Sequence, residues 1–74
     1  MAVRITYDAE ADAAIIYLKD NIEPGGAPHS VMCDLEIREG AVILLLDDDE
    51  TLVGIEVLGA AKLLPRELLG IDPG

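Results

Sequence analysis

Residues 42–58 hold the feature that most constrains the fold of this chain, two apolar runs separated by four consecutive acids. Both runs, 42–46 and 52–58, are rich in branched aliphatic residues, which pack well on the pleated surface of a sheet. The acids at 47–50 cannot be buried together, so they must form an exposed turn. The stretch therefore predicts a β-hairpin whose first arm is apolar on both faces.

Alternating apolar and polar residues predict two strands before this hairpin. Val3, Ile5 and Tyr7 alternate with polar residues, so the first strand should end near Tyr7. The alternation is clearest over residues 31–38, which predicts a half-exposed strand. Residues 21–28 contain two prolines and two glycines and should form the loop that leads into it.

Residues 8–19 are compatible with two structures. Residues 13–19 are mostly apolar without alternation, which favours a strand covered on both faces. A helix over residues 9–18 is the alternative, because alanine is the best helix former and Asp8 would cap the first turn. We prefer the strand, because Ile15, Ile16 and Tyr17 in succession do not form a single helical stripe.

The periodicity changes after Gly59. Residues 60–64 suit a short helix, which Pro65 is placed to end because it lacks an N–H group. Alternatively, Pro65 begins a second helical turn that ends at Gly70.

Taken together, these elements predict an α+β fold that is mainly β. We expect an antiparallel meander sheet of about five strands followed by one short C-terminal helix. Residues 1–64 would form one β-rich domain with the terminal helix, and residues 65–74 a partly disordered C-terminal extension.

The small size of the chain predicts self-association. A domain of 74 residues gains only a small core, and its single cysteine, Cys33, excludes an intramolecular disulfide. No set of Cys and His residues could hold a structural zinc. The strands at 13–19 and 42–46 are apolar on both faces, whereas one short helix can cover only one side. We therefore predict a homodimer.

The charge of the chain limits its partners. Fifteen acids against five scattered bases give a net charge of −10, which argues against nucleic acid and favours a basic protein partner. No apolar run approaches the length of a membrane span, and no secretory signal is recognisable. We expect a cytoplasmic protein that does not bind membranes.

The alternating acids Asp8, Glu10 and Asp12 resemble the start of a calcium-binding loop. In such a loop the sixth position is a glycine and the twelfth a glutamate, but here they are Ala13 and Lys19. We therefore predict no metal and no cofactor. Asp8 and Asp12 should instead accept backbone N–H bonds in an Asx-type turn.

Glu56 is the acid whose environment should be most unusual, because it lies mid-strand between apolar residues, beside Gly54. We expect a structural role for it. Its carboxylate would pair with Arg4, Arg38 or Lys62, or accept N–H groups at the start of the following helix.

Residues with catalytic potential are few and do not form a recognisable set. His29 is isolated beside the loop, Ser30 lacks the setting of an activated nucleophile, and Cys33 shares a strand face with aliphatic residues. The sequence thus favours a non-enzymatic interaction module. The alternative is a small-ligand- or metal-binding protein, or a minor enzyme, that uses Asp8, Asp12 and Glu56.

Two motifs, YDAEADA at residues 7–13 and LVGIEVLGAA at residues 52–61, together resemble the DUF2283 family of small bacterial proteins of uncharacterised function. The resemblance covers residues 3–64. The chain departs from the family pattern in the turn at 48–51, at Ala61, where a serine is common, and in its extension from Pro65.

The resemblance marks six residues whose role it does not assign: Tyr7, Asp8, Asp12, Gly54, Ile55 and Glu56. It implies a small acidic partner protein encoded beside another small gene, with an antitoxin-like role.

Overall fold

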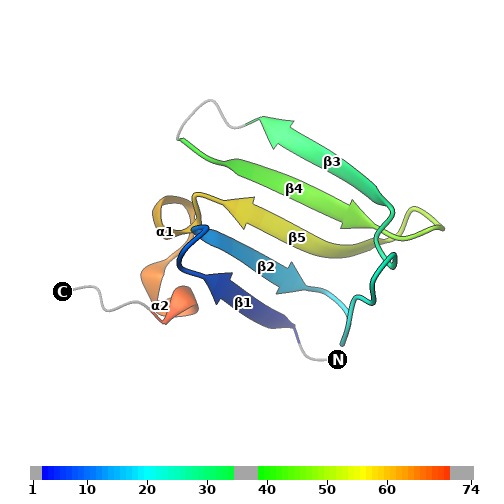
Figure 1. Ribbon diagram of the computed structural model, residues 1–74, viewed down its shortest axis with the longest axis horizontal. Helices are drawn as coiled ribbons and strands as arrows, with labels where there is room; N and C mark the ends of the chain where they lie inside the picture. The colour runs from blue at the N-terminus through cyan, green and yellow to red at the C-terminus, as the bar shows by residue number, and fades with distance from the viewer. Residues whose placement is uncertain (1–2, 35–38, 71–74) are drawn as a thin grey trace.

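The structure, a computed structural model, describes residues 3–34 and 39–70. Over these residues the chain forms one antiparallel sheet with two short helices (Figure 1). Its elements are β1 (Arg4–Asp8), β2 (Ala13–Tyr17), β3 (His29–Asp34), β4 (Ala41–Leu46), β5 (Leu52–Leu58), α1 (Ala60–Leu63) and α2 (Arg66–Leu69). The predicted fold class, a mainly β chain with a five-stranded antiparallel sheet, is confirmed.

The hairpin at 42–58 is confirmed as β4 and β5. Its turn is shaped by the first acid, because Asp47 Oδ1 accepts the backbone N–H groups of Asp49 and Thr51 at 2.9 Å each. Glu50 completes the turn with a left-handed backbone, φ 64°. A register shift beside Leu45 and Leu46 adds an extra residue to β5.

The segment that admitted a strand or a helix is a strand. β2 pairs with β1 on one edge and with β5 on the other, and it ends two residues earlier than predicted. β3 begins at His29, before the predicted start, and the predicted continuation over 35–38 lies outside the described residues.

The strand order is β1-β2-β5-β4-β3, so the sheet consists of an N-terminal hairpin and a three-stranded meander. The two units join through β2 and β5, which are far apart in the sequence. The connection at 18–28 crosses from β2 to the far edge of the sheet, where β3 begins (Figure 1). β5 is consequently the central strand, paired on both sides.

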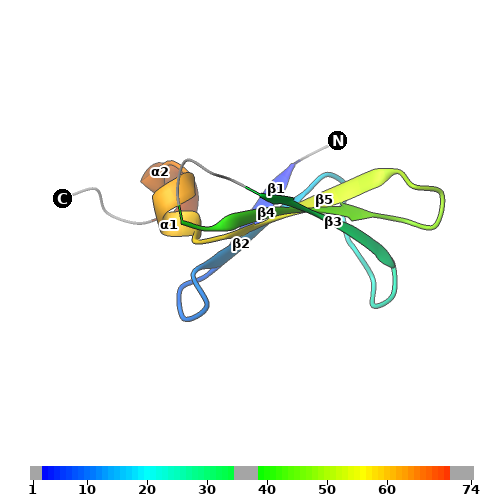
Figure 2. The same cartoon turned by 90° about the horizontal axis from the view of Figure 1, so that it is seen from above.

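Both helices lie on one side of the sheet, at the end where β5 ends (Figure 2). Gly59 begins α1 with a left-handed backbone, φ 73°. Pro65 then precedes α2, and Gly70 ends it in the same conformation, so the second helical turn is confirmed. Among the described residues each helix has only four residues, far fewer than a membrane-crossing helix needs.

The core lies between these helices and the sheet. It is built on Ala14, Val57 and Ala60, which are at most 2% exposed. The partly buried residues that pack against them are Tyr7, Ile55, Leu63, Leu64 and Leu69.

The register divides the strand residues between two faces, because directly paired residues point to the same side. We call the side that carries the helices the helix face; it includes Tyr7, Ala14, Ile55, Val57, Val42, Leu44, Val31 and Cys33. The other side, the open face, includes Thr6, Ile15, Tyr17, Gly54, Glu56, Ile43, Leu45 and Met32.

Candidate functional site

The six residues marked by the sequence motifs divide into two groups in the structure. Tyr7, Asp8 and Asp12 surround the turn between β1 and β2. Gly54, Ile55 and Glu56 are consecutive in the central strand β5, where Ile55 contributes to the core on the helix face. Gly54 and Glu56 belong to the opposite, open face.

Asp12 joins the turn between β1 and β2 to the start of α1. Its Oδ1 atom accepts hydrogen bonds from the Tyr7 hydroxyl at 2.8 Å and from the N–H of Ala61 at 2.9 Å. Its backbone carbonyl accepts the N–H groups of Gly59 at 2.9 Å and Ala60 at 3.0 Å. We call this set of bonds the Asp12 latch. It satisfies three N–H groups at the start of α1, which has no side-chain cap at Gly59 itself.

The latch changes the acidity of Tyr7. The hydrogen bond to Asp12 raises the pKa of the Tyr7 phenol above 10.0, and desolvation and the negative charges of Asp12 and Asp8 act in the same direction. Removing the phenolic proton would place a second negative charge against the Asp12 carboxylate. The pair therefore favours the protonated phenol.

Asp8 shapes the same turn from its first residue. Its Oδ1 accepts the N–H of Glu10 at 3.0 Å and approaches the N–H of Ala11 at 3.5 Å, the pattern of an Asx turn. The predicted Asx turn is thus confirmed for Asp8. The Asp12 carboxylate also accepts a backbone N–H, but from Ala61 on α1, not from its own turn. The positive φ of Asp12, 50°, aims its carbonyl and side chain at that helix.

Gly54 leaves space for the connection between β2 and β3. A Cβ atom at Gly54 would lie 2.8 Å from Ile22 Cδ1 and 3.3 Å from Leu45 Cδ1. The missing side chain therefore lets Ile22 lie against the open face, and this contact anchors the 18–28 connection over β5.

Glu56 lies at the centre of the open face. In the register it is opposite Ile15 on β2 and opposite Ile43 on β4, and its side chain is half-buried. Among the described residues no hydrogen bond or ion pair is found for its carboxylate. A carboxylate is therefore placed between two isoleucines on the face of the sheet that neither helix covers.

The predicted pairing of Glu56 with Arg4, with Lys62 or with the start of the following helix is wrong, because each of these groups contacts another residue. Arg4 stacks on the Tyr17 ring, 4.2 Å from its centroid, and donates to the carbonyl of Asp20. Lys62 forms an ion pair with Glu39 at 3.4 Å. The N–H groups at the start of α1 donate to Asp12. The remaining candidate, Arg38, lies outside the described residues.

The acids considered for metal or acid–base chemistry do not converge. Asp8 and Asp12 bond to the backbone around the first turn, whereas Glu56 is on the open face of β5. In the part of the chain that the structure describes, no group of three or more His, Cys, Asp or Glu residues is placed to hold a metal ion.

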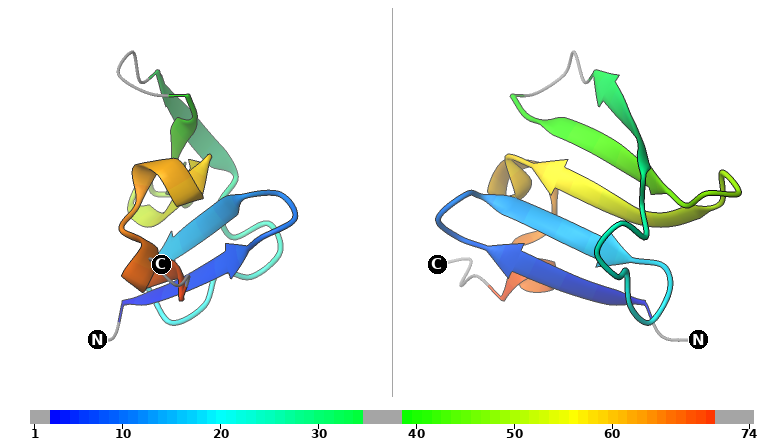
Figure 3. Two further views of the ribbon diagram at one scale, coloured as in Figure 1. Left: turned by 90° about the vertical axis from the view of Figure 1, so that its left-hand side faces the viewer. Right: turned by 45° about the vertical axis from the view of Figure 1, so that its right-hand side comes forward.

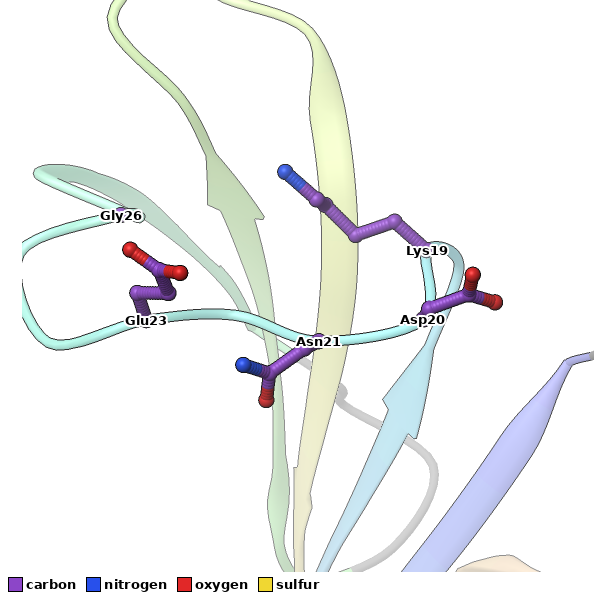
Figure 4. Close-up of a pocket in the computed structure, with 5 residues that line it drawn as sticks. All are labelled: Lys19, Asp20, Asn21, Glu23 and Gly26. Atoms are coloured by element: carbon purple, nitrogen blue, oxygen red, sulfur yellow. The ribbon is translucent and has the colours of Figure 1, made fainter.

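Two shallow hollows lie at the end of the sheet that carries the 47–50 turn. One, of about 620 Å³, is lined by Lys19, Asp20, Asn21, Glu23 and Gly26 (Figure 4). In Figure 4 the Lys19, Asp20 and Asn21 side chains extend in different directions, so they do not form one binding set. The second, of about 630 Å³, includes His29, Ser30 and Glu50, and no hydrogen bond joins these three side chains.

Comparison with known proteins gives one match. The model of a family described as a protein of unknown function, DUF2283, matches residues 4–60. No curated protein and no solved structure matches the chain.

Proposed function

The chain belongs to the DUF2283 family, whose function is unknown, and from its own geometry we propose that it is an acidic protein–protein interaction module whose open face docks a basic partner protein. The observation that carries this proposal is the position of Glu56. Its carboxylate is half-buried between Ile15 and Ile43 on a face that neither helix covers.

The residues around Glu56 suit a protein surface better than a small molecule. Ile15, Ile43 and Leu45 are half-buried, and Met32 at the edge of the face is 67% exposed. None of these residues lines either of the two hollows described above, whereas small-ligand sites are concave. A partner that presents one Arg or Lys among aliphatic side chains would cover the isoleucines and neutralise Glu56 at the same time.

The charge of the whole chain supports a basic partner. A net charge of −10 creates a negative field that speeds the approach of a positively charged protein. Once the partner is docked, an unpaired Glu56 would be buried at a cost, which selects against partners without a matching cation.

The other acids of the sequence motifs support a binding role over an enzymatic one. Asp8 and Asp12 each accept backbone N–H groups at Oδ1, which gives both carboxylates a structural task in the turn and at the start of α1. The Tyr7 hydroxyl donates a hydrogen bond to Asp12. The family resemblance implies an antitoxin-like role. In the terms of this proposal, the chain would bind a small basic protein and block its surface.

The test is affinity capture from native lysate with three forms of the full chain: wild type, Glu56→Gln and Glu67→Gln. Glu67 is exposed on α2, so the second variant makes the same change of charge away from the open face. We expect a stoichiometric basic protein on wild type and on Glu67→Gln, released by high salt, and at least about tenfold less on Glu56→Gln.

Equal capture by Glu56→Gln and wild type would overturn the proposal. So would an acidic captured protein, because the negative field would then repel it. A metal ion or metabolite retained in place of a protein would favour the alternative function, ligand binding through Asp8, Asp12 and Glu56.

A further inference from the structure

One row of side chains crosses the open face at the level of Glu56. The register places Ile15 and Ile43 on either side of Glu56, with Thr6 beyond Ile15 and Met32 beyond Ile43. We call these five residues the Glu56 row. Neighbouring strands lie about 4.8 Å apart, so the row spans about 19 Å from one edge of the sheet to the other.

The Glu56 row is on the face that neither helix covers (Figure 2). Its two ends are exposed, Met32 to 67%, and the three residues between them are half-buried. Among the described residues no hydrogen bond or ion pair is found for the Glu56 carboxylate. The row therefore offers an anionic centre with an aliphatic side chain on each side.

The next row along the strands, towards the connection between β2 and β3, is occupied by the chain itself. Arg4 stacks on the Tyr17 ring, 4.2 Å from its centroid. Gly54, opposite Tyr17, has no side chain, and Ile22 of the connection lies against it. Figure 3 shows this connection running past the ends of β2, β5 and β4, at the end of the sheet opposite the helices.

This occupied row limits the direction in which a ligand can lie. Gly54 is two residues from Glu56, so Ile22 begins about 7 Å from Glu56 along β5. A helix centred on Glu56 and aligned with β5 would run into Ile22. The half-width of a helix with its side chains is about 5–6 Å, so a helix that lies across the strands clears Ile22.

The spacing of the row favours a helix over an extended strand. Ile43 and Met32 lie one and two strand spacings from Glu56, about 4.8 and 9.6 Å. Residues three and seven positions apart on a helix are separated by about 4.5 and 10.5 Å along its axis. Alternate residues of a strand repeat every 6.7 Å or so, which matches neither distance.

We propose that the open face binds an amphipathic helix of the partner protein, which lies across the strands over the Glu56 row. The helix carries one Lys or Arg over Glu56 and an apolar residue three or four positions away over Ile15. On the other side of the cation it carries apolar residues three or four and seven positions away, over Ile43 and Met32.

This binding mode rests on the proposed function, because it specifies the partner surface that Glu56 would recognise. Charge complementarity selects the occupant, since a chain with a net charge of −10 and a carboxylate at the centre of the row attracts a basic helix. A second copy of this chain fits poorly. Two open faces in contact would bring two Glu56 carboxylates together, and like charges oppose ionisation.

The test of the helical spacing uses synthetic peptides and the full chain. One peptide of about 16 residues is held helical by side-chain lactams and carries the proposed pattern, with Arg as the cation and Leu as the apolar residue. A linear peptide of the same composition carries Leu at alternate positions around Arg, the spacing of a strand. Isothermal titration should show at least about tenfold tighter binding of the helical peptide.

Replacement of the peptide Arg by Gln tests the position of the cation. On the wild-type chain this change should weaken binding by at least about tenfold. On Glu56→Gln it should weaken binding by less than about twofold, because the carboxylate that it pairs with is already absent.

The ends of the row test the direction of the helix. Thr6→Lys and Met32→Lys, on opposite edges of the sheet, should each weaken binding of the helical peptide several-fold, because a helix across the strands reaches both. Val31→Lys is the matched control. Val31 is 51% exposed beside Met32 but belongs to the helix face, so this variant should bind almost as wild type does. All three variants should keep the wild-type far-ultraviolet circular dichroism spectrum.

Equal or tighter binding of the linear peptide would contradict the helix, as would full binding by both Thr6→Lys and Met32→Lys. No binding of the helical peptide, together with Glu56-dependent capture of a basic protein from lysate, would reject the helix and leave the proposed function standing. Glu56-dependent binding of the helical peptide, with no basic protein captured, would support the helix site and reject the proposed partner.

Discussion

The Tyr7 hydroxyl lies 2.8 Å from Asp12 Oδ1, and the same oxygen accepts the N–H of Ala61, so one carboxylate oxygen connects the first strand to the first helix. The connection spans 49 residues of sequence between Asp12 and Ala61. Asp12 is therefore the point at which the N-terminal hairpin and the C-terminal helices hold one another in place.

Replacement of Asp12 by alanine should lower the free energy of unfolding by about 2–4 kcal/mol, because two donors lose their acceptor and alanine is disfavoured at φ 50°. Asp12→Asn should lose less, since an amide oxygen still accepts and asparagine tolerates a positive φ. Urea denaturation measures both. Asp48→Ala, in the exposed turn, is the control, and an equal effect of Asp48→Ala and Asp12→Ala would contradict the latch.

Alkaline pH should weaken the latch. The pKa of Tyr7 is raised above 10.0 in the folded chain, chiefly by its hydrogen bond to Asp12, so the folded state holds the proton more tightly than the unfolded state. The stability that this provides is fully present below pH 10.0 and is lost as the pH rises through the folded pKa. Ultraviolet titration in a Tyr17→Phe background should show that Asp12→Asn moves the midpoint of Tyr7 towards 10.0. An unchanged midpoint would mean that Asp12 is not the cause.

A methyl group at Gly54 should compete with Ile22 for space. Gly54→Ala brings the new Cβ to 2.8 Å from Ile22 Cδ1, the flexible end of a side chain, so the expected cost is about 1 kcal/mol. Ile22→Val removes that carbon and should relieve the clash. A double-mutant cycle by chemical denaturation should give a coupling of at least about 0.5 kcal/mol. Additive effects would show that the connection does not lie on Gly54.

Glu56→Leu should stabilise the isolated chain by about 0.5–1 kcal/mol, because it places an aliphatic side chain between Ile15 and Ile43 and removes a half-buried carboxylate that has no partner among the described residues. The same variant should not bind a basic partner. Thermal and urea unfolding measure the first effect. A loss of stability greater than about 1 kcal/mol would mean that the carboxylate makes a stabilising contact in the folded chain.

The local features of the fold were predictable because they depend on neighbouring residues. Four consecutive acids cannot be buried, so the turn at 47–50 followed from composition alone. Alternation identified β1 and β3. Pro65 and Gly70 gave the second helical turn as one of two alternatives, the other being an end of the helix at Pro65. The Asx turn at Asp8 belongs to the same class, since donor and acceptor are two residues apart.

The candidate site was predicted only in part. The sequence motifs indicated both Asp12 and Glu56. For Glu56 the expected partners were Arg4, Arg38, Lys62 or the N–H groups at the start of the helix, but those N–H groups donate to Asp12. The sequence places Glu56 only three residues before Gly59, whereas Asp12 is 47 residues before it. Proximity in sequence made Glu56 one candidate acceptor for these N–H groups, but the alternation of β5 turns Glu56 to the face away from α1.

By itself, the sequence determined the hairpin at 42–58, the first strand, the net charge and the family of this protein, since periodicity and turn chemistry act over a few residues. It left residues 8–19 open to a strand or a helix. Only the tertiary structure decided that β2 pairs with β5. The backbone hydrogen bonds of a sheet can form between any two suitable apolar strands, so the sequence of one strand does not specify which strand it pairs with. That one pairing brings Asp12 to α1 and places Glu56 opposite Ile15, on the face of the sheet away from the helices.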